Sequence, residues 1–117
     1  MANPHRGEVA LETADGTFHV LRYTVNSLCA LEERLEMPIA RIAALFEGAD
    51  GISMRHLRAV LWAGLIDRQP DLTEAEAGRI MDDAGMAAVT RAIERAFTAA
   101  FPASEGRARG RPRKAAG

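Results

Sequence analysis

The sequence has few of the residues that support metal-based or covalent chemistry. It contains one cysteine, Cys29, and three histidines, with no C-x-x-C or H-x-x-x-H spacing. One cysteine cannot form an intrachain disulfide, and structural metal sites need closely spaced Cys and His ligands. Cys29 lies among the leucines of a predicted helix, so we expect a buried thiol that packs as a small apolar side chain rather than a nucleophile. The sequence therefore predicts neither a metal site nor a cofactor.

Residues for acid–base or phosphate chemistry are also sparse. Glu12 with His19, which face each other in a predicted hairpin, and Asp82 with Asp83 are the only candidate pairs. Cross-strand charge pairs and acidic helix ends are common in proteins without catalytic activity. The glycines do not form a phosphate-binding loop followed by Lys and Ser or Thr. We therefore expect a protein that is not an enzyme.

Aromatic residues and long apolar runs are scarce as well. Aromatics make up 5% of the 117 residues, so the predicted core depends on Leu, Ile, Val, Met and Ala, which favours packed helices over a large sheet. The longest apolar run, Ala59–Ile66, is too short to span a membrane, and the first residues lack the apolar segment of a secretory signal. The overall composition is that of one globular domain. We expect a cytoplasmic protein that makes no membrane contact.

Local patterns predict an α+β fold that is mostly α. It consists of an N-terminal β-hairpin and a small bundle of four to five helices. Asp15-Gly16 separates the strand-like segments 8–12 and 17–23, and this dipeptide suits a two-residue type I′ turn. That turn pairs Leu11 with Val20. One face of the hairpin is then apolar and needs a helix against it.

Capping residues and apolar periodicity predict five helices after the hairpin. Their predicted ranges are 25–36, 38–46, 54–67, 74–83 and 86–100. Thr24 and Ser53 are suitable N-cap residues, and Thr73 with Glu76 forms a capping box. Pro102 stops the last helix.

Charge is distributed unevenly along the chain. Residues 1–101 carry 10 basic and 15 acidic side chains, a net charge of −5, whereas residues 102–117 carry five basic and one acidic, a net charge of +4. We predict one hairpin-plus-helices domain over 1–101 and a disordered Arg-rich tail over 102–117.

The tail contains a run that is similar to an AT-hook, in which Arg-Gly-Arg lies in the minor groove of A·T-rich DNA. The residues of this candidate nucleic-acid site are Arg109, Gly110, Arg111, Pro112 and Arg113. A chain with 14 Arg and 23 Ala also produces such strings by chance. A basic tail without sequence preference is therefore the alternative.

Two apolar features indicate a protein-binding function. In helix 54–67 the apolar arc is wide, because Trp62 and Ile66 lie roughly 100° round from Leu61. Either this helix is central and touches several neighbours, or Trp62 and Ile66 face a partner. The hairpin has two open edges, which are either solvated or extended by a strand from another chain. The predicted partner contacts are Leu61, Trp62, Leu65, Ile66, Val9 and Leu11.

The order of these features resembles that of one known family. The opening Met-Ala-Asn-Pro-His-Arg-Gly-Glu-Val precedes the hairpin, Tyr-Thr-Val-Asn-Ser-Leu-Cys-Ala-Leu-Glu occupies 23–32, and Leu-Trp-Ala-Gly-Leu occupies 61–65, before a final Ala-rich helix. Over about residues 4–101 the chain is similar to the small tail proteins of gene transfer agents and phages. These are classed as tail assembly chaperones and are also called tail tube proteins. The Arg-rich tail is not part of this pattern.

The resemblance implies a non-enzymatic protein of siphophage-like tail assembly. Such chaperones coat the long helical tape measure protein and help to recruit tail tube subunits. The tape measure protein and the tail tube protein are therefore the expected partners. Whether the chain also forms a homo-oligomer stays open. A structural tail component, such as a tube subunit, is one alternative, although tube proteins generally resemble larger β-rich folds. A small DNA-associated protein that acts through the AT-hook-like tail is another.

Overall fold

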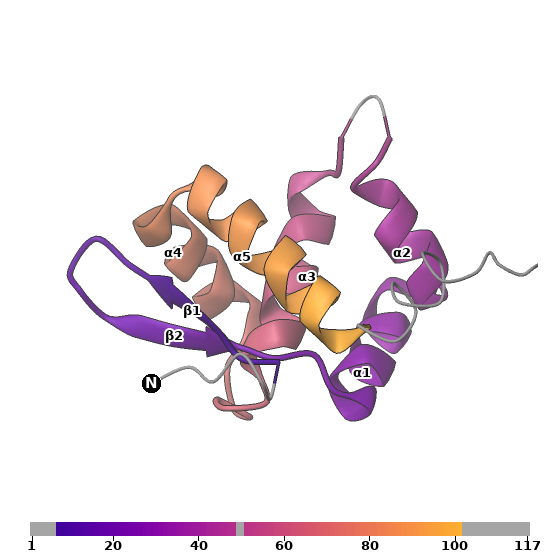
Figure 1. Cartoon of the computed structure of the whole chain (residues 1–117), viewed down its shortest axis with the longest axis horizontal. Helices are drawn as coiled ribbons and strands as arrows, with labels where there is room; N and C mark the ends of the chain where they lie inside the picture. Colours follow the sequence, from indigo (N-terminus) through magenta and orange to yellow (C-terminus); the bar gives the residue numbers. More distant parts are fainter. Residues whose placement is uncertain (1–6, 49–50, 102–117) are drawn as a thin grey trace, which may run out of the picture.

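A computed structural model describes residues 7–48 and 51–101, and these form a hairpin followed by five helices (Figure 1). The elements are β1 (Val9–Glu12), β2 (Phe18–Leu21), α1 (Val25–Leu35), α2 (Ile39–Leu45), α3 (Met54–Leu65), α4 (Glu74–Ala84) and α5 (Met86–Ala100). The predicted α+β, mostly helical fold is confirmed. The disorder predicted for 102–117 concerns residues outside the described part of the chain, and the domain boundary at 101 stays a prediction.

Three helices begin at the predicted caps. Thr24 Oγ1 accepts a hydrogen bond from Ser27 N at 3.1 Å, and Ser27 Oγ accepts one from Thr24 N at 2.7 Å. Thr73 and Glu76 form the same reciprocal pair at the start of α4. Ser53 Oγ accepts from the third residue of α3. Each pair satisfies backbone N–H groups that have no partner within the helix, which is why these starts can be predicted from short motifs.

The start of α2 depends on another helix. The side chain of its N-cap residue, Pro38, makes no capping hydrogen bond. Instead, Ile39 N donates a hydrogen bond to the Glu32 carboxylate of α1 at 2.7 Å. Glu36 ends α1 in the left-handed conformation, with φ 57°. The angle between α1 and α2 is therefore stabilised by a side chain of α1 rather than by a cap in α2.

The hairpin turn differs from the predicted type I′ turn. Gly16 N donates to Thr13 O at 3.0 Å and Thr13 N donates to Thr17 O at 2.9 Å, while Gly16 has a φ of 86° and Asp15 does not have a positive φ. This is the pattern of a three-residue loop with a glycine bulge. The extra residue shifts the register by one, so that Leu11 pairs with His19. The predicted register was therefore wrong.

The register shift changes which hairpin residues reach the core. Val9, Leu11 and Leu21 are buried, whereas Phe18 is 64% exposed. Side chains alternate between the two faces of a strand, so a shift of one residue exchanges the faces of β2 relative to β1. α3 and α5 cover the buried face, as predicted for an apolar hairpin face.

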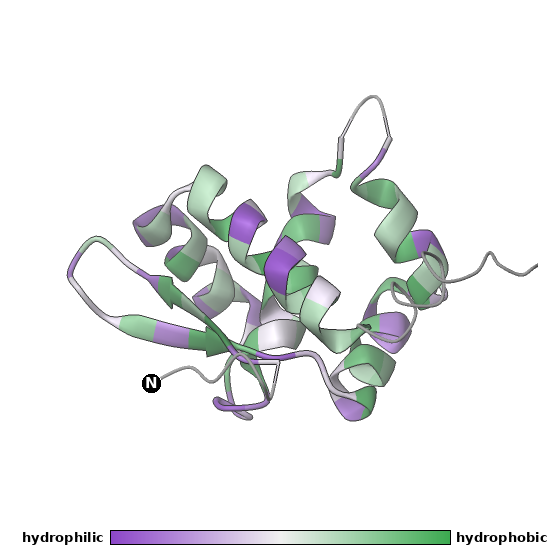
Figure 2. Cartoon of the chain, in the orientation of Figure 1, coloured by the Kyte–Doolittle hydropathy of each residue, from purple (hydrophilic) through white to green (hydrophobic). Residues whose placement is uncertain are grey.

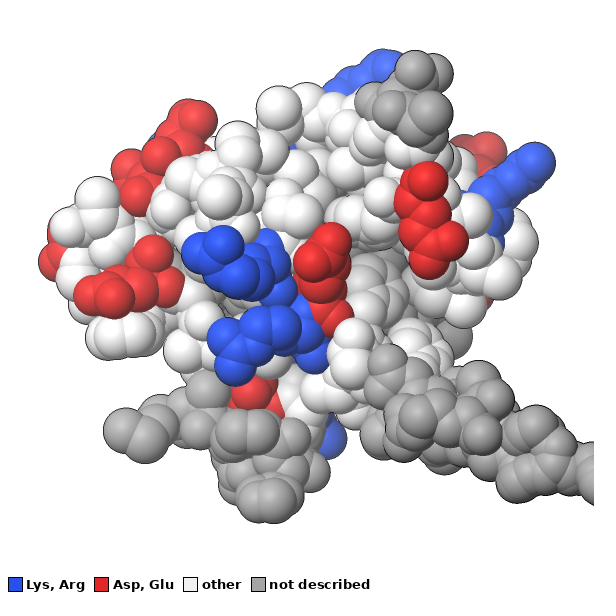
Figure 3. All heavy atoms as spheres, turned by 45° about the horizontal axis from the view of Figure 1, so that its top comes forward, with Lys and Arg blue, Asp and Glu red and all other residues white. Residues whose placement is uncertain are grey.

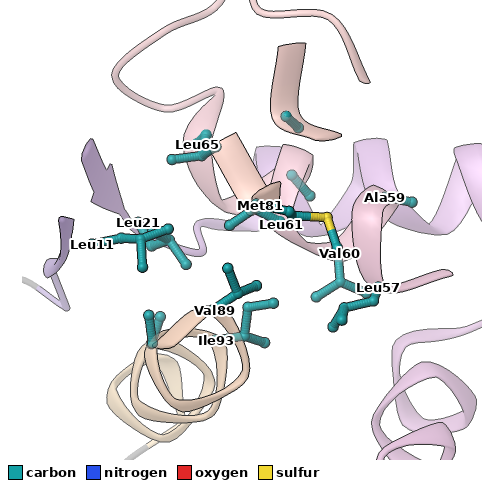
Figure 4. Packing of buried hydrophobic residues seen from close by; sticks show 14 of the residues in the cluster. Leu11, Leu21, Leu57, Ala59, Val60, Leu61, Leu65, Met81, Val89 and Ile93 are labelled. Atoms are coloured by element: carbon teal, nitrogen blue, oxygen red, sulfur yellow. The ribbon is translucent and has the colours of Figure 1, made fainter. Parts of the chain in front are cut away.

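α3 is the central helix of the fold. It contacts β2, α1, α4 and α5. Figure 4 shows its side chains pointing toward Met81 of α4, Val89 and Ile93 of α5, and the hairpin. Its buried residues are Leu57, Ala59, Val60, Leu61, Ala63, Gly64 and Leu65. Packing within the chain therefore accounts for the wide apolar arc of this helix, and none of the helices in residues 7–48 and 51–101 is long and apolar enough to cross a membrane.

Ion pairs connect elements that are distant in sequence. Glu74 at the start of α4 pairs with Arg34 of α1 and lies 3.9 Å from Arg58 of α3. Arg68, after α3, pairs with the nearly buried Glu8 beside β1 at 2.5 Å. These pairs join α1, α3 and α4, and hold the base of the hairpin to the segment after α3.

Candidate protein-binding surface

The predicted partner-contact residues fall into two groups in the folded chain. Four of them lie in the core, with exposures of 7% or less: Val9, Leu11, Leu61 and Leu65. Trp62 and Ile66 are half-buried. Trp62 Nε1 donates a hydrogen bond to Leu72 O at 3.0 Å, so this side chain also ties the α3–α4 loop to α3. The binding role of the set stays a prediction.

Cys29 lies on the exposed side of α1, and the expectation of a buried thiol was wrong. The buried residues of α1 are Ser27 and Leu31, which are four positions apart and share one face of the helix. Cys29 is midway between them and therefore points away from the core. The small side chain that α1 buries is therefore that of Ser27 and not the thiol of Cys29.

The fold does not pair Glu12 with His19, the first of the two candidate acid–base pairs. Glu12 is paired with Phe18, and the His19 ring lies 3.1 Å from Gln69 Nε2. Asp82 and Asp83 are exposed near the end of α4. Among residues 7–48 and 51–101, no three His, Cys, Asp or Glu side chains are grouped so that they could hold a metal ion. The AT-hook-like run of the sequence lies outside the described residues.

Four of the six aromatic side chains gather where α2, α3 and α5 approach each other. Tyr23 stacks on Phe97 with ring centroids 4.4 Å apart. Phe46 meets Phe97 edge-on at 6.2 Å, and Phe101 stacks beside Phe97 at 6.4 Å. Aromatic pairs in such geometries add to the stabilisation that burial provides. Phe97 is therefore the centre of an aromatic cluster. The low aromatic content of the sequence did not predict it.

Gly64 allows this cluster to form against α3. A Cβ at Gly64 would lie 2.9 Å from Tyr23 Cζ, closer than side chains approach each other. The Tyr23 hydroxyl donates to Val60 O at 2.7 Å, and burial raises the pKa of Tyr23 above its ordinary range. The Gly64 carbonyl accepts a hydrogen bond from Arg22 N at 2.9 Å. Tyr23 is thus fixed between α3 and Phe97, and Phe97 is held in position by it.

An apolar groove of about 350 Å³ lies between α2 and the end of α5, beside the aromatic cluster. Figure 2 shows that α2 is mainly hydrophobic. The lining residues are Ile39, Ala40, Ala43, Phe97, Thr98 and Phe101. None of them is charged. Ile39 with Ala43, and Phe97 with Phe101, are each four residues apart, so their spacing is the sequence signal that could have identified the two walls of the groove.

Two other depressions are less suited to an apolar partner. One, of about 490 Å³, is lined by residues of α5 alone, Met86 to Glu94, and is therefore the surface of one helix rather than a cleft. The other, of about 330 Å³, lies at the α1–α2 junction and contains Glu32 and Glu33. On the face drawn in Figure 3, a group of positive side chains lies directly beside negative ones near the centre, and uncharged areas surround them. The α2–α5 groove combines an apolar lining with walls from two elements.

Comparison with known proteins identifies the family but not a closer relative. No curated protein and no solved structure matched the chain. The family model described as "Phage tail tube protein, GTA-gp10" matches residues 6–103, which includes every described residue. The resemblance seen in the sequence is thereby confirmed. The chain belongs to the GTA-gp10 family of phage tail proteins.

Proposed function

We propose that this protein is a non-enzymatic tail assembly chaperone. In this role it binds an apolar helical segment of the tape measure protein, of tail tube subunits or of both during assembly of a gene transfer agent or siphophage-like particle. Membership of the phage tail family supports a role in tail assembly. The observation that carries the binding role is the uncharged groove between α2 and α5.

The groove has the chemistry that an amphipathic helix needs. Such a helix presents apolar side chains at positions i, i+3, i+4 and i+7 to a hydrophobic groove. Ala40, Ala43 and Thr98 are exposed and small, so they permit close approach of a partner backbone, and Phe101, 37% exposed, adds aromatic area at the rim. A volume of about 350 Å³ holds a few side chains rather than a whole helix. This favours a contact that forms and releases during assembly.

A structural role as a tube subunit is the second candidate, and the printed description of the family supports it. The described residues contain two strands of four residues each, both in one hairpin. This is little sheet for a protein that builds a tube from β-rich subunits. Immunoblotting of purified particles distinguishes the two roles, because a chaperone is lost from the finished particle and a tube subunit is retained in many copies. The DNA-associated role rests on residues outside the described part of the chain.

The binding role can be tested by co-expression with a tape measure protein of a gene transfer agent or siphophage-like particle, followed by affinity capture. Ala43→Glu places a carboxylate in the groove, whereas Ala44→Glu places it on the exposed surface of the same helix, outside the groove. Both positions are exposed, so both variants should unfold at the wild-type temperature. We expect capture to fall at least tenfold in Ala43→Glu and to stay at the wild-type level in Ala44→Glu. Equal capture by the two variants would exclude the groove as the binding surface.

A further inference from the structure

The outer edge of β2 has no backbone partner in the described part of the chain. Opposed residues of an antiparallel pair alternate between those that exchange backbone hydrogen bonds and those that do not. Thr13 N donates to Thr17 O at 2.9 Å, so by alternation the N–H and C=O groups of Phe18 and Val20 point away from β1. Within residues 7–48 and 51–101, no other backbone bonds to these groups, and the sheet has two strands. Each of the two residues therefore offers one donor and one acceptor to a further strand.

The open part of this edge is limited by α3. Arg22 follows the same alternation, and its N–H donates to Gly64 O at 2.9 Å. The edge is therefore closed beyond Leu21 and open toward the hairpin loop. A strand of four residues is about 13 Å long, which is enough for a short extended segment. Figure 1 shows the hairpin at the opposite end of the molecule from α2, so this edge is distinct from the α2–α5 groove.

The outward face of the hairpin is apolar beside this edge. Phe18 is 64% exposed, Val20 is half-buried, and Ala10, which is paired with Val20, is exposed. These residues lie on the face opposite to Leu11 and Leu21, which pack in the core. Aromatic and β-branched side chains gain contacts from neighbours on an adjacent strand. An added strand with apolar side chains beside Phe18 and Val20 therefore covers area that the described chain leaves open.

The hairpin tip next to Phe18 is acidic. Glu12 is paired with Phe18 and shares its face of the sheet. Asp15 lies in the loop, and its pKa is lowered to about 2, chiefly by the hydrogen bond that the Thr13 side chain donates, so this carboxyl group is ionised at neutral pH. Residues 9–21 contain no Lys or Arg. The hairpin therefore supplies no cation of its own to these carboxylates.

The end of α4 extends this acidic area. Ala14 N donates to Asp83 O at 3.1 Å, which places the last turn of α4 beside the hairpin loop. Asp82 and Asp83 are exposed there, and Arg79 is the basic residue of the same helix. Figure 3 shows mainly negative side chains at the end of the molecule that holds the hairpin tip and α4 in Figure 1. Charge complementarity therefore favours a partner with Lys or Arg close to the tip.

We propose that the outer edge of β2 binds an extended, basic segment of another protein. The segment pairs antiparallel to Phe18–Leu21, places apolar side chains beside Phe18 and Val20, and places Lys or Arg near Glu12 and Asp15. Its backbone supplies the hydrogen bonds, and its side chains supply the specificity, as in other cases of strand addition to a sheet edge. This surface does not depend on the groove of the proposed function.

An extended basic segment fits this edge better than other occupants. A helix satisfies its own backbone groups and leaves those of Phe18 and Val20 without partners. DNA carries dense negative charge, which the acidic tip repels. A second copy that pairs through the same strands brings Glu12 and Asp15 again, and no Lys or Arg within residues 9–21.

The test uses the full chain, labelled with ¹⁵N, and three synthetic peptides. The first is Lys-Lys-Val-Thr-Val-Thr-Val-Lys-Lys, in which the Val side chains share one face of an extended chain. The second has Glu in place of the four Lys. The third is the Lys peptide with N-methyl groups on the three Val, which keeps its charge and removes the donors that face β2 in an antiparallel pairing. NMR titration measures the affinities, and solvent exchange of the Phe18 and Val20 amide protons is measured with and without peptide.

We expect the Lys peptide to bind at least tenfold more tightly than either of the other two and to slow exchange of the Phe18 and Val20 amides at least tenfold at saturation. Phe18→Thr and Glu12→Lys should each weaken the Lys peptide at least fivefold. Met54→Thr removes an apolar side chain that is 61% exposed on α3, and Glu33→Lys makes the same change of charge on the exposed side of α1. These two matched controls should bind as the wild type does, and thermal unfolding of all four variants confirms that they are folded.

Equal affinity of the Lys peptide and its N-methylated form would overturn strand addition, because charge alone would then account for binding. Equal affinity of the Lys and Glu peptides would overturn the basic character of the partner. Exchange of the Phe18 and Val20 amides that slows with rising protein concentration, in the absence of peptide, would assign the edge to a second copy instead. Ala43→Glu should leave the Lys peptide unaffected, so failure of this proposal and failure of the proposed function are separate outcomes.

Discussion

The hairpin end of the molecule and its α2 end are packed to different degrees. Where β1, β2, α3 and α5 meet, Leu21, Leu61, Val89 and Ile93 have no exposed surface. At the other end, Ile42 is the one buried residue of α2, and the exposed small residues of that helix line a groove. The two ends belong to the same chain and are both apolar, yet only the first is closed by its own neighbours.

The length and composition of α2 account for the difference. It has seven residues, three of them alanines, so it covers little of the surface of α5. α3, with twelve residues, has neighbours on several sides. An apolar surface that its own chain leaves uncovered is where a partner can supply the missing contacts. We therefore expect stability to depend mainly on the α3-centred core and binding of an apolar helix mainly on the α2 end.

Truncation of a core residue should have the largest effect on stability. Leu61→Ala removes a fully buried side chain from the centre of α3 and should lower the free energy of unfolding by about 2–5 kcal/mol. Ile39→Ala, at the half-buried groove wall, should cost roughly 1 kcal/mol. Urea unfolding followed by circular dichroism measures both. If both variants lost the same free energy of unfolding, the hairpin end and the α2 end would be packed to the same degree, contrary to the difference described above.

A methyl group added at the junction of the two regions should have the next largest effect. Gly64→Ala forces Cβ against the Tyr23 ring, which is held by Phe97 and by its hydrogen bond to Val60 O, and should cost about 1–3 kcal/mol. Gly78→Ala in α4 is the matched control, because its Cβ meets only the flexible Arg58 side chain. That change should be neutral or stabilising by up to about 1 kcal/mol. Thermal unfolding of both variants provides the measurement, and a stabilised Gly64→Ala would contradict the close packing of Tyr23.

A smaller loss is expected at the edge of the core. Trp62→Phe keeps an aromatic side chain but removes the donor to Leu72 O, and should lower the free energy of unfolding by about 1 kcal/mol. Because Trp62 is not part of the groove lining, capture of the tape measure protein should be unchanged. Loss of capture with wild-type stability would instead make Trp62 a partner contact and move binding away from the α2 end.

The smallest effect is expected at the hairpin tip, far from the groove. Hydrogen bonds from the Thr13 side chain and from Thr17 lower the pKa of Asp15 from 3.8 to about 2. A carboxyl group with a lower pKa in the folded state stabilises the protein above the unfolded pKa, and this contribution is lost as pH falls from about 4 to about 2.

Asp15→Asn should therefore reduce the dependence of stability on pH between about 2 and 4 and leave partner capture unchanged. Chemical unfolding at several pH values in this window measures the difference between variant and wild type. Parallel pH profiles for the two proteins would mean that Asp15 titrates alike in the folded and unfolded states.

Sequence patterns were sufficient where the determining interactions are local. The caps at Thr24, Ser53 and Thr73 lie within three residues of the groups that they satisfy, so the starts of α1, α3 and α4 were predicted correctly. The order of features along the chain also indicated the family that the comparison confirmed. The hairpin was predicted but its register was not, because Asp-Gly suits both a type I′ turn and a turn with a glycine bulge.

By itself, then, the sequence determined the kind and order of the elements and the starting points of α1, α3 and α4, since helix propensity, capping and turn formation act over a few residues. Tertiary structure alone decided which faces are covered. It placed Cys29 outside and Ser27 inside, gathered Tyr23 and Phe97 from opposite ends of the chain, and left a groove beside α2. Burial depends on contacts between residues far apart in sequence, and no local pattern specifies which apolar face is left without a neighbour.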